Sequence, residues 1–535
     1  MRLVIKQRRE VNPVKPRRSR VNVAIFLPMP YRAAMSSLFL QFAYLYLNSI
    51  EGVSAIRVVY NYAEDCVEIL DKGITLRDID LLILSLPYEL NYFYVVRALK
   101  AMNIPLASRD RTRPLIVAGG VAPAANPLPL IDIVDAVAVG DAEPLLPPIL
   151  SAVEELADGK RRALEALSDV EGIVTKITVE CMDIKRKNVV LDLDKAPHPV
   201  FQVVPLDEKP VYGNGFRLEV SRGCARMCPF CMESRVMHPF RFRSLRALTA
   251  ILDRVEELRE IYGSRIVIYS LSLLDTPIAK NLLRKIVERG YSGSIPSMRP
   301  EHLGDQEVLE LAKSLGQRTL TIAPESPIPS VARALGKSFD IESLANHCIH
   351  AYRMGFEHVK MYFIYGAANE TPSQFVTHFS KFLKELSKQG IDVSRFIEVG
   401  INPLIPKPWT CFELLPPIYV LKLESELERV RDELRRCGTK PSIYSARLSF
   451  VQSAIALGGE EISKYIVRSA LEPSPIRSFI TEVLSKKPRY IECGWDDPPW
   501  RRVLDLGIAP CIYAFMDELQ KRIIDGASTR RRFST

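Results

Sequence analysis

The chain has 535 residues and a net charge of +9, with 47% hydrophobic and 25% charged residues. This composition is close to that of an average globular protein, and the length predicts about three or four domains. No apolar run approaches the ~18 residues that a membrane span needs, and no apolar segment of a secretory signal follows the N-terminus. We therefore expect a cytoplasmic protein without a membrane span.

Positive charge is concentrated at the two ends of the chain. Residues 1–20 form a basic arm with eight Lys or Arg against one acid, Glu10, and Arg530 to Arg532 add three more cations. Such an arm can bind RNA by neutralising phosphates, so RNA is one candidate partner. A solvated, partly disordered tail has the same composition, because basic blocks are weak motifs on their own.

Residues 21–155 alternate apolar runs with helical patterns. Strands are expected at 21–27, 55–60, 79–85, 115–118 and 136–139, with a helix from 31 to 49 and another that ends near 102. This alternation predicts a doubly wound α/β domain with a parallel sheet. Ligands of such sheets bind at the carboxyl ends of the strands, where Gly119-Gly120 and Gly140-Asp141 follow two of the runs.

The rest of the chain divides into three segments. Residues 156–209 read as a linker with short strands. Residues 210–415 carry six strand candidates, at 216–220, 265–269, 293–296, 319–323, 358–363 and 396–401. They predict a central partial (β/α)6 barrel of the TIM type, whose chemistry lies at the C-terminal strand ends. Residues 416–535 are expected to form a helical C-terminal domain, since 421–437 has Leu, Glu and Arg at helix spacing.

Three cysteines follow the first barrel strand directly. Cys224, Cys228 and Cys231 have CxxxCxxC spacing. A [4Fe-4S] cluster usually has four thiolate ligands, so three leave one iron open. That iron can chelate the amino and carboxylate groups of S-adenosylmethionine (SAM). One-electron reduction then releases methionine and a 5′-deoxyadenosyl radical, while the protein orients the reactants and excludes water.

Other readings of the cysteines remain open. A zinc site needs a fourth ligand, for which His238 is available, and three buried structural thiols are a further alternative. Disulfides are not expected without a secretion signal. Cys411, Cys437, Cys493 and Cys511 match no compact Fe–S spacing, so isolated core thiols are expected there rather than a second cluster.

Several motifs carry a family resemblance over nearly the whole chain. They are Ser85-Leu86-Pro87-Tyr88-Glu89-Leu90, Ala118-Gly119-Gly120, Gly140-Asp141-Ala142-Glu143, Arg222-Gly223-Cys224, Phe230-Cys231, Ser270-Leu271-Ser272 and Ala323-Pro324-Glu325-Ser326. With these motifs the chain resembles the radical SAM superfamily, in the branch with a cobalamin-binding-like N-terminal domain, and its core is similar to that of methylthiotransferases.

The resemblance implies a set of SAM contacts. The two serines end the second strand, where the superfamily holds the SAM amino group, and the other polar side chains follow later strands, where SAM or the substrate binds. The aromatic ring suits packing on the SAM adenine. The implied residues are Phe230, Ser270, Ser272, Arg299, Glu325 and Arg333. Ordinary caps, surface ion pairs and loop packing are the alternatives.

Cobalamin is a candidate cofactor with one departure from the expected pattern. Related proteins offer a His to cobalt in a loop after the first strand, but residues 28–32 read Pro-Met-Pro-Tyr-Arg, and all seven histidines follow residue 197. Since His is the commonest metal ligand, the domain either binds cobalamin without an imidazole or has lost the cofactor.

The sequence therefore predicts a radical SAM enzyme that abstracts hydrogen from an unidentified substrate. The basic ends favour RNA, while lipids, peptides and small molecules stay open. A ferredoxin or flavodoxin type of protein is the expected one-electron donor. The alternative is a non-catalytic scaffold, stabilised by zinc or an Fe–S cluster, that binds RNA.

Overall fold

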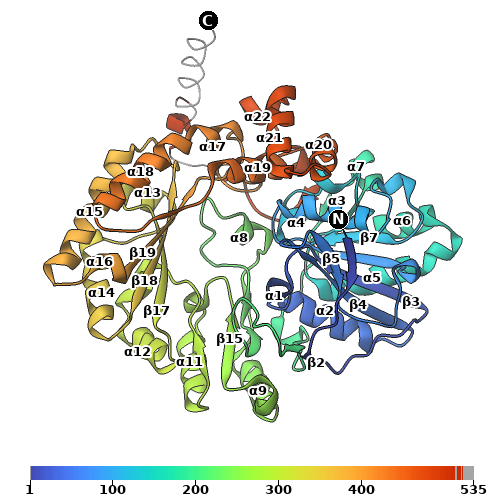
Figure 1. Cartoon of the computed structure of the whole chain (residues 1–535), viewed down its shortest axis with the longest axis horizontal. Helices are drawn as coiled ribbons and strands as arrows, with labels where there is room; N and C mark the ends of the chain where they lie inside the picture. The colour runs from blue at the N-terminus through green and yellow to red at the C-terminus, as the bar shows by residue number, and fades with distance from the viewer. Residues whose placement is uncertain (1, 512–514, 520, 522–535) are drawn as a thin grey trace, which may run out of the picture.

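The computed structural model describes residues 2–511, 515–519 and 521. Two α/β units lie side by side, and helices from the C-terminal part of the chain cross above both (Figure 1). Among the described residues, no helix is long and apolar enough to cross a membrane.

The N-terminal unit is an eight-stranded sheet with the order β1-β5-β4-β3-β6-β7-β8-β9. The five predicted strands form its parallel centre, and all seven residues of β3 are buried, as expected for a central parallel strand. Two short strands were not predicted: β5, which pairs antiparallel with β4, and β9, which pairs antiparallel with β8. The strands are β1 (Arg2–Ile5), β3 (Val21–Leu27), β4 (Val53–Asn61), β5 (Cys66–Ile69), β6 (Leu81–Ser85), β7 (Leu115–Gly119), β8 (Ala136–Ala138) and β9 (Ile173–Thr175).

Helices cover both faces of this sheet. One face packs against α1 (Tyr31–Ala34), α2 (Leu38–Ser49), α5 (Ala142–Glu154) and α6 (Lys160–Ser168). The other packs against α3 (Asn91–Ala101) and against helices from the C-terminal part of the chain. The doubly wound arrangement is therefore confirmed. Helix α6 and strand β9 lie in the segment 156–209 that was expected to be a linker.

The basic arm is part of this unit rather than a separate tail. Strand β1 is the edge strand of the sheet and pairs parallel with β5, while β2 (Glu10–Val11) pairs with β11 (Val204–Pro205). Arg8 forms ion pairs with Glu68 and Glu208. A charge count along the chain does not reveal these partners, because they lie far away in sequence. Arg530 to Arg532 lie outside the described residues.

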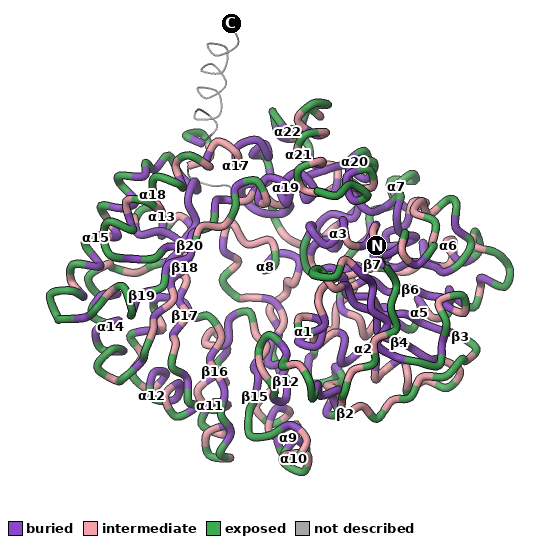
Figure 2. Tube along the Cα trace, viewed as in Figure 1, coloured by how far each residue is buried: buried purple, intermediate pink, exposed green. Residues whose placement is uncertain are grey.

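The second unit is an open barrel of parallel strands. All six predicted strands form, in two sheets of order β12-β15-β16 and β17-β18-β19-β20, joined by a bridge between Met298 and Ile322. The strands are β12 (Phe216–Glu219), β15 (Arg265–Tyr269), β16 (Ser292–Ser294), β17 (Thr319–Glu325), β18 (His358–Tyr365), β19 (Ile397–Pro403) and a short additional strand, β20 (Ser442–Ile443). Figure 2 shows the buried strands of both units against largely exposed outer helices.

The barrel helices lie outside the strands, as in a TIM-type fold. They are α9 (Leu245–Glu256), α11 (Ala279–Glu288), α12 (Gln306–Ser314), α13 (Pro329–Ala334), α14 (Ile341–Arg353) and α15 (Pro372–Lys388). Two pairs along this series, α11 with α12 and α14 with α15, pack directly on each other. The partial barrel expected from the sequence is confirmed.

The C-terminal part is helical where it is described, as predicted. It contains α17 (Ile418–Lys422), α18 (Glu424–Arg436), α19 (Ala446–Ala456), α20 (Ile462–Ala470), α21 (Pro475–Lys486) and α22 (Arg489–Cys493). One expectation here is wrong: Cys411 and Cys511 are not isolated thiols but form a disulfide. The two residues are 100 positions apart in sequence, so no local pattern marks them as a pair.

Candidate active site

The three clustered cysteines lie on a loop that is closed by a short stem. The stem strands β13 (Ser221–Arg222) and β14 (Arg241–Phe242) pair antiparallel, and β13 follows β12 almost directly. The loop therefore starts at the carboxyl end of the first barrel strand. Gly223 has φ of 75°, and a Cβ there would lie 2.6 Å from the carbonyl oxygen of Met237, so the first turn of the loop requires glycine.

The donor set of the loop distinguishes between metal sites. Cys228 is buried and Cys224 and Cys231 are half-buried. A structural zinc ion needs four protein ligands. A [4Fe-4S] cluster that keeps one iron open needs only three thiolates, so the three cysteines of the loop fit such a cluster.

Arg299 reaches the cysteine loop from the end of the third barrel strand. Its Nη1 atom lies 3.8 Å from Cys228 Sγ, and its Nη2 atom donates to the Gly336 carbonyl at 2.6 Å and to Glu301 at 2.9 Å. The side chain is 8% exposed. The predicted Arg299 therefore lies beside a predicted cluster ligand, and its other contacts fix its orientation.

Glu325, at the end of β17, is buried next to a second cation. Its carboxylate lies 3.4 Å from Lys337 Nζ. Burial raises the pKa of Glu325 to about 7, although Lys337 and Arg299 act in the opposite direction. Its φ of 65° is uncommon for a residue with a side chain, and such strained backbone is concentrated at functional sites. Lys337 was not predicted from the sequence, since it belongs to no motif.

The two predicted serines have different surroundings. Ser270 lies 2.6 Å from Ser221, Oγ to Oγ, and lines a large cavity. Ser272 instead donates to Asp275, which also accepts from Arg226 of the cysteine loop. Burial acts to raise the pKa of Asp275, but hydrogen bonds from His302, Arg226 and Ser272 outweigh it and hold the pKa well below its usual range. Sequence reasoning missed Asp275, which anchors the loop to the second strand.

The last two predicted residues lie at the edge of the site. Phe230 is half-buried and packs against the barrel core. Arg333 is on α13, the helix after the fourth strand as expected, but its side chain is exposed. The structure thus brings Arg299 and Glu325 close to Cys228, and it places Arg333 on the surface.

A cavity of about 1170 Å³ lies between the two α/β units. Its N-terminal wall contains the predicted strand ends, Ser85, Gly119-Gly120 and Gly140, and its barrel wall includes Ser270. The cavity extends as an apolar slot between the sheet and two helices, lined by Leu38, Phe39, Phe42, Ile83, Leu145 and Leu146. The carboxyl edge of the N-terminal sheet is therefore a ligand-sized space, as the topology predicts.

Comparison with known proteins identifies two families in the chain. Residues 41–175 match the family described as radical SAM proteins, N-terminal, and residues 218–382 match the radical SAM superfamily. The uncharacterised protein MJ0966 of Methanocaldococcus jannaschii is 25% identical over 486 residues, which cover 90% of this chain and 98% of that protein.

Two solved structures show distant similarity. The radical SAM methyltransferase TsrM from Kitasatospora setae, with cobalamin and a [4Fe-4S] cluster bound, is 14% identical over 72% of each chain, with a TM-score of 0.47. The cobalamin-dependent SAM radical enzyme OxsB, with aqua-cobalamin bound, is 15% identical over 69% of this chain and 52% of that one, with a TM-score of 0.46.

The family matches cover much of both units, and the match to residues 218–382 includes all three cysteines of the loop. Together with the donor set, they favour an enzyme over the zinc-stabilised scaffold. The chain therefore contains a radical SAM domain and the N-terminal domain of radical SAM proteins, and it is an enzyme of the kind that uses a [4Fe-4S] cluster and SAM.

Proposed function

We propose that Cys224, Cys228 and Cys231 hold the cluster, and that the enzyme abstracts hydrogen from its substrate. When bound, the cluster and SAM supply a 5′-deoxyadenosyl radical. The observation that carries the proposal is the group of buried charges beside Cys228: Arg299 at 3.8 Å, and Glu325 paired with Lys337. The amino acid part of SAM has a carboxylate, which needs cationic partners, and an amino group, whose N–H bonds need an acceptor next to the open iron.

The chain's own residues then have separate tasks. Arg299 and Lys337 supply positive charge for the SAM carboxylate, and Glu325 supplies an acceptor for the N–H bonds of the SAM amino group. Ser270 remains a candidate for a hydrogen bond to SAM at the cavity wall. Ser272 acts through Asp275 and Arg226, which hold the loop. Phe230 is proposed to pack on the adenine, whereas the exposed position of Arg333 gives its proposed role little support.

A second ligand is proposed for the cavity between the units. At about 1170 Å³ it exceeds the usual range for drug-sized ligands of about 300–1,000 Å³. The cavity offers room for a large group between the units and apolar side chains around Leu146 for an aromatic group. Cobalamin has a large corrin ring and a nucleotide tail that ends in an aromatic base, so we propose a cobalamin-class cofactor. No histidine lines this cavity among the described residues, so the cofactor would bind without a protein imidazole.

RNA has less support as the substrate than the charge of the arm suggests. Arg8, Arg18 and Arg20 form ion pairs with acids of the protein itself. In the cavity wall, Arg222 and Arg241 are likewise paired with carboxylates. RNA binding requires cations that contact phosphates and displace the counterions of the nucleic acid, and these arginines already have acidic partners in the protein. We propose a ferredoxin or flavodoxin type of electron donor, since the cluster needs an external reductant.

Hydrogen abstraction can be tested without knowledge of the substrate. The reconstituted enzyme would be supplied with SAM, dithionite and separate RNA, lipid, peptide and small-molecule fractions from cells grown in D₂O. Transfer of deuterium into 5′-deoxyadenosine, measured by mass spectrometry, is expected from one fraction and identifies the substrate class. If 5′-deoxyadenosine forms but carries no deuterium with any fraction, the hydrogen-abstraction proposal is wrong.

A further inference from the structure

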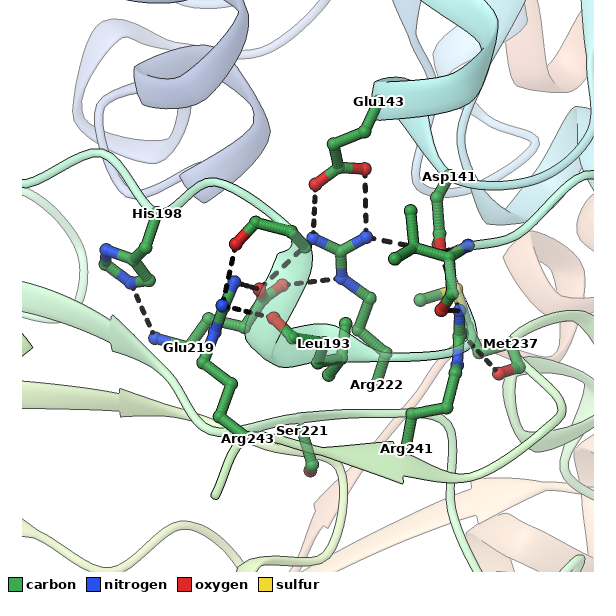
Figure 3. A network of polar contacts seen from close by, with 12 residues as sticks. Asp141, Glu143, Leu193, His198, Glu219, Ser221, Arg222, Met237, Arg241 and Arg243 are labelled. Atoms are coloured by element: carbon green, nitrogen blue, oxygen red, sulfur yellow. Dashed lines mark hydrogen bonds and ion pairs between the residues drawn. The ribbon is translucent and has the colours of Figure 1, made fainter. Parts of the chain in front are cut away.

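A buried network of ion pairs joins the N-terminal unit to the stem of the cysteine loop (Figure 3). Arg222 of β13 donates to both oxygens of Glu143, at 2.7 and 3.0 Å, and also to Glu219, at 2.8 and 3.1 Å. Arg241 of β14 donates to Asp141 at 2.6 Å. Side-chain exposure is 13% for Arg222, 11% for Glu143, 4% for Arg241 and 5% for Asp141, so water screens these charges little.

The stem cannot close without these acids. Arg222 lies directly opposite Arg241 in the antiparallel pair of strands. Like charges at such positions repel each other, and a buried guanidinium without a partner is costly. Glu219 gives Arg222 one partner from the barrel, but it also serves Arg243 at 2.8 Å. The remaining negative charge comes from Asp141 and Glu143 of the N-terminal unit.

The chain between β8 and α5 is shaped to present these two acids. Gly140 has φ of 141°, and a Cβ there would lie 1.8 Å from the carbonyl oxygen of Asn188, so only glycine fits. Asp141 is the N-cap residue of α5 but makes no capping hydrogen bond with its side chain. Its carboxylate instead accepts hydrogen bonds from Arg241 and from the Val190 backbone, at 2.6 and 2.8 Å.

The charge balance at the stem follows from this geometry. Burial acts to lower the pKa of Arg222, but hydrogen bonds and charges from Glu143, Glu219 and Asp141 outweigh it and raise the pKa. Burial likewise acts to raise the pKa of Glu219, yet Arg222 and Arg243 lower it to about 2. Removal of one acid of the N-terminal unit therefore leaves a buried arginine with fewer acidic partners.

We propose that Asp141 and Glu143 are positioning residues for the iron–sulfur cluster. They neutralise the two stem arginines, and they thereby hold residues 223–240, with all three cysteines, in the closed loop that accepts the cluster. The N-terminal domain is then required for cluster binding, independently of any ligand in the cavity. The motif Gly140-Asp141-Ala142-Glu143 acquires a physical role that its sequence alone does not reveal.

The first test uses the full-length chain without its cluster. Labelling of the buried Cys228 by iodoacetamide is followed by mass spectrometry under anaerobic, reducing conditions, with the exposed Cys493 as an internal reference. The double variant D141N/E143Q is expected to label Cys228 about tenfold faster, which corresponds to about 1.4 kcal/mol of local opening. Cys493 should react at the wild-type rate.

A matched control separates this role from general loosening of the domains. Glu89 and Lys407 form another ion pair between the N-terminal unit and the rest of the chain, with exposures of 2% and 12%, and Glu89 is not an acidic partner of Arg222 or Arg241. The variant E89Q should leave Cys228 labelling unchanged. Equal labelling of Cys228 in the wild type and D141N/E143Q overturns the proposal, and so does an equal acceleration in E89Q.

The second test uses the reconstituted protein. Iron release to a chelator should be faster in E143Q and in R222K than in the wild type. The variant R222K keeps the positive charge but loses the bidentate contact with Glu143. Release at the wild-type rate from both single variants would contradict the proposal. If circular dichroism shows that the double variant does not fold, E143Q also serves for the labelling experiment, with a smaller expected increase.

Discussion

The Arg299 guanidinium lies 3.8 Å from the Cys228 sulfur, so the end of the third barrel strand meets the loop that follows the first. Gly336 supports this contact, because its carbonyl accepts from Arg299, and a Cβ at this position would lie 3.7 Å from the Cys228 sulfur. Lys337, the next residue, pairs with Glu325 at 3.4 Å. A cluster-bound SAM would therefore meet charges of both signs that the fold has already fixed.

Glu325 is expected to make stability depend on pH. Its folded pKa of about 7 lies above the ordinary value of 4.5, so the folded protein binds a proton that the unfolded chain has lost. The stabilisation is complete below about pH 4.5 and disappears as pH rises through about 7. The shift amounts to about 3 kcal/mol, at about 1.4 kcal/mol per pKa unit.

The measurement is urea unfolding of the cluster-free protein between pH 5 and pH 8. The unfolding free energy of Glu325→Gln should fall less between pH 5 and pH 8 than that of the wild type. The exposed Glu398→Gln serves as a control and should retain the wild-type slope. Identical slopes for the wild type and Glu325→Gln would show that Glu325 titrates normally.

Arg8 is expected to be structural despite its place in the basic arm. Its side chain is 10% exposed and it pairs with Glu68, which is 1% exposed. Arg8→Gln should lower the unfolding free energy by about 2 kcal/mol, because it leaves a buried carboxylate with fewer partners. Arg9, 80% exposed, is the matched control, and Arg9→Gln should have almost no effect. Equal unfolding free energies of Arg8→Gln and Arg9→Gln would instead indicate that the arm is solvated.

The apolar slot is expected to be necessary for cobalamin binding. Leu146→Trp fills the slot from α5, so hydroxocobalamin should no longer elute with the protein in gel filtration, as followed by its visible absorbance. Iron content should be unchanged, since Leu146 is not among the cluster-loop residues. Ser151→Trp, on an exposed position of the same helix, is the control. Unaltered cobalamin binding by Leu146→Trp would exclude the slot as the binding site.

The Cys411–Cys511 disulfide is expected to be detectable by mass spectrometry and to stabilise the oxidised protein. Without reductant, mass spectrometry should find a peptide that links the two cysteines, and Cys411→Ser should lower the unfolding free energy by up to about 4 kcal/mol, for a loop of 100 residues. With reductant, variant and wild type should be equally stable. Complete alkylation of both cysteines in the oxidised protein would rule out the bond.

Much of the fold is predictable from local patterns. The continuous apolar run of β3 and the regular alternation of strands and helices predict a parallel sheet and a barrel, because each element carries its own periodicity. Strand β1 was missed because it lies within the basic arm and takes its place only by pairing with β5, which is distant in sequence, and β5 was missed because it is only four residues long. Short edge strands carry little signal of their own.

The candidate site likewise contains residues that a local motif identifies and residues that only the folded structure brings together. The cysteine spacing is local and specific, whereas Lys337 and Asp275 act through three-dimensional neighbours and belong to no motif. Ser272 was assigned to SAM from its strand end, but it turns toward Asp275 instead. The role of Glu143 depends on Arg222, 79 residues away, so only the folded chain reveals it.

The central claim is that the cysteine loop supports reductive cleavage of SAM. The direct measurement is 5′-deoxyadenosine formed from SAM and dithionite by the anaerobically reconstituted protein, compared with Cys228→Ala and with the control Cys437→Ala. Wild type and Cys437→Ala should produce 5′-deoxyadenosine, and Cys228→Ala should produce none. Absence of product from fully cluster-loaded wild type, or undiminished product from Cys228→Ala, would contradict the claim.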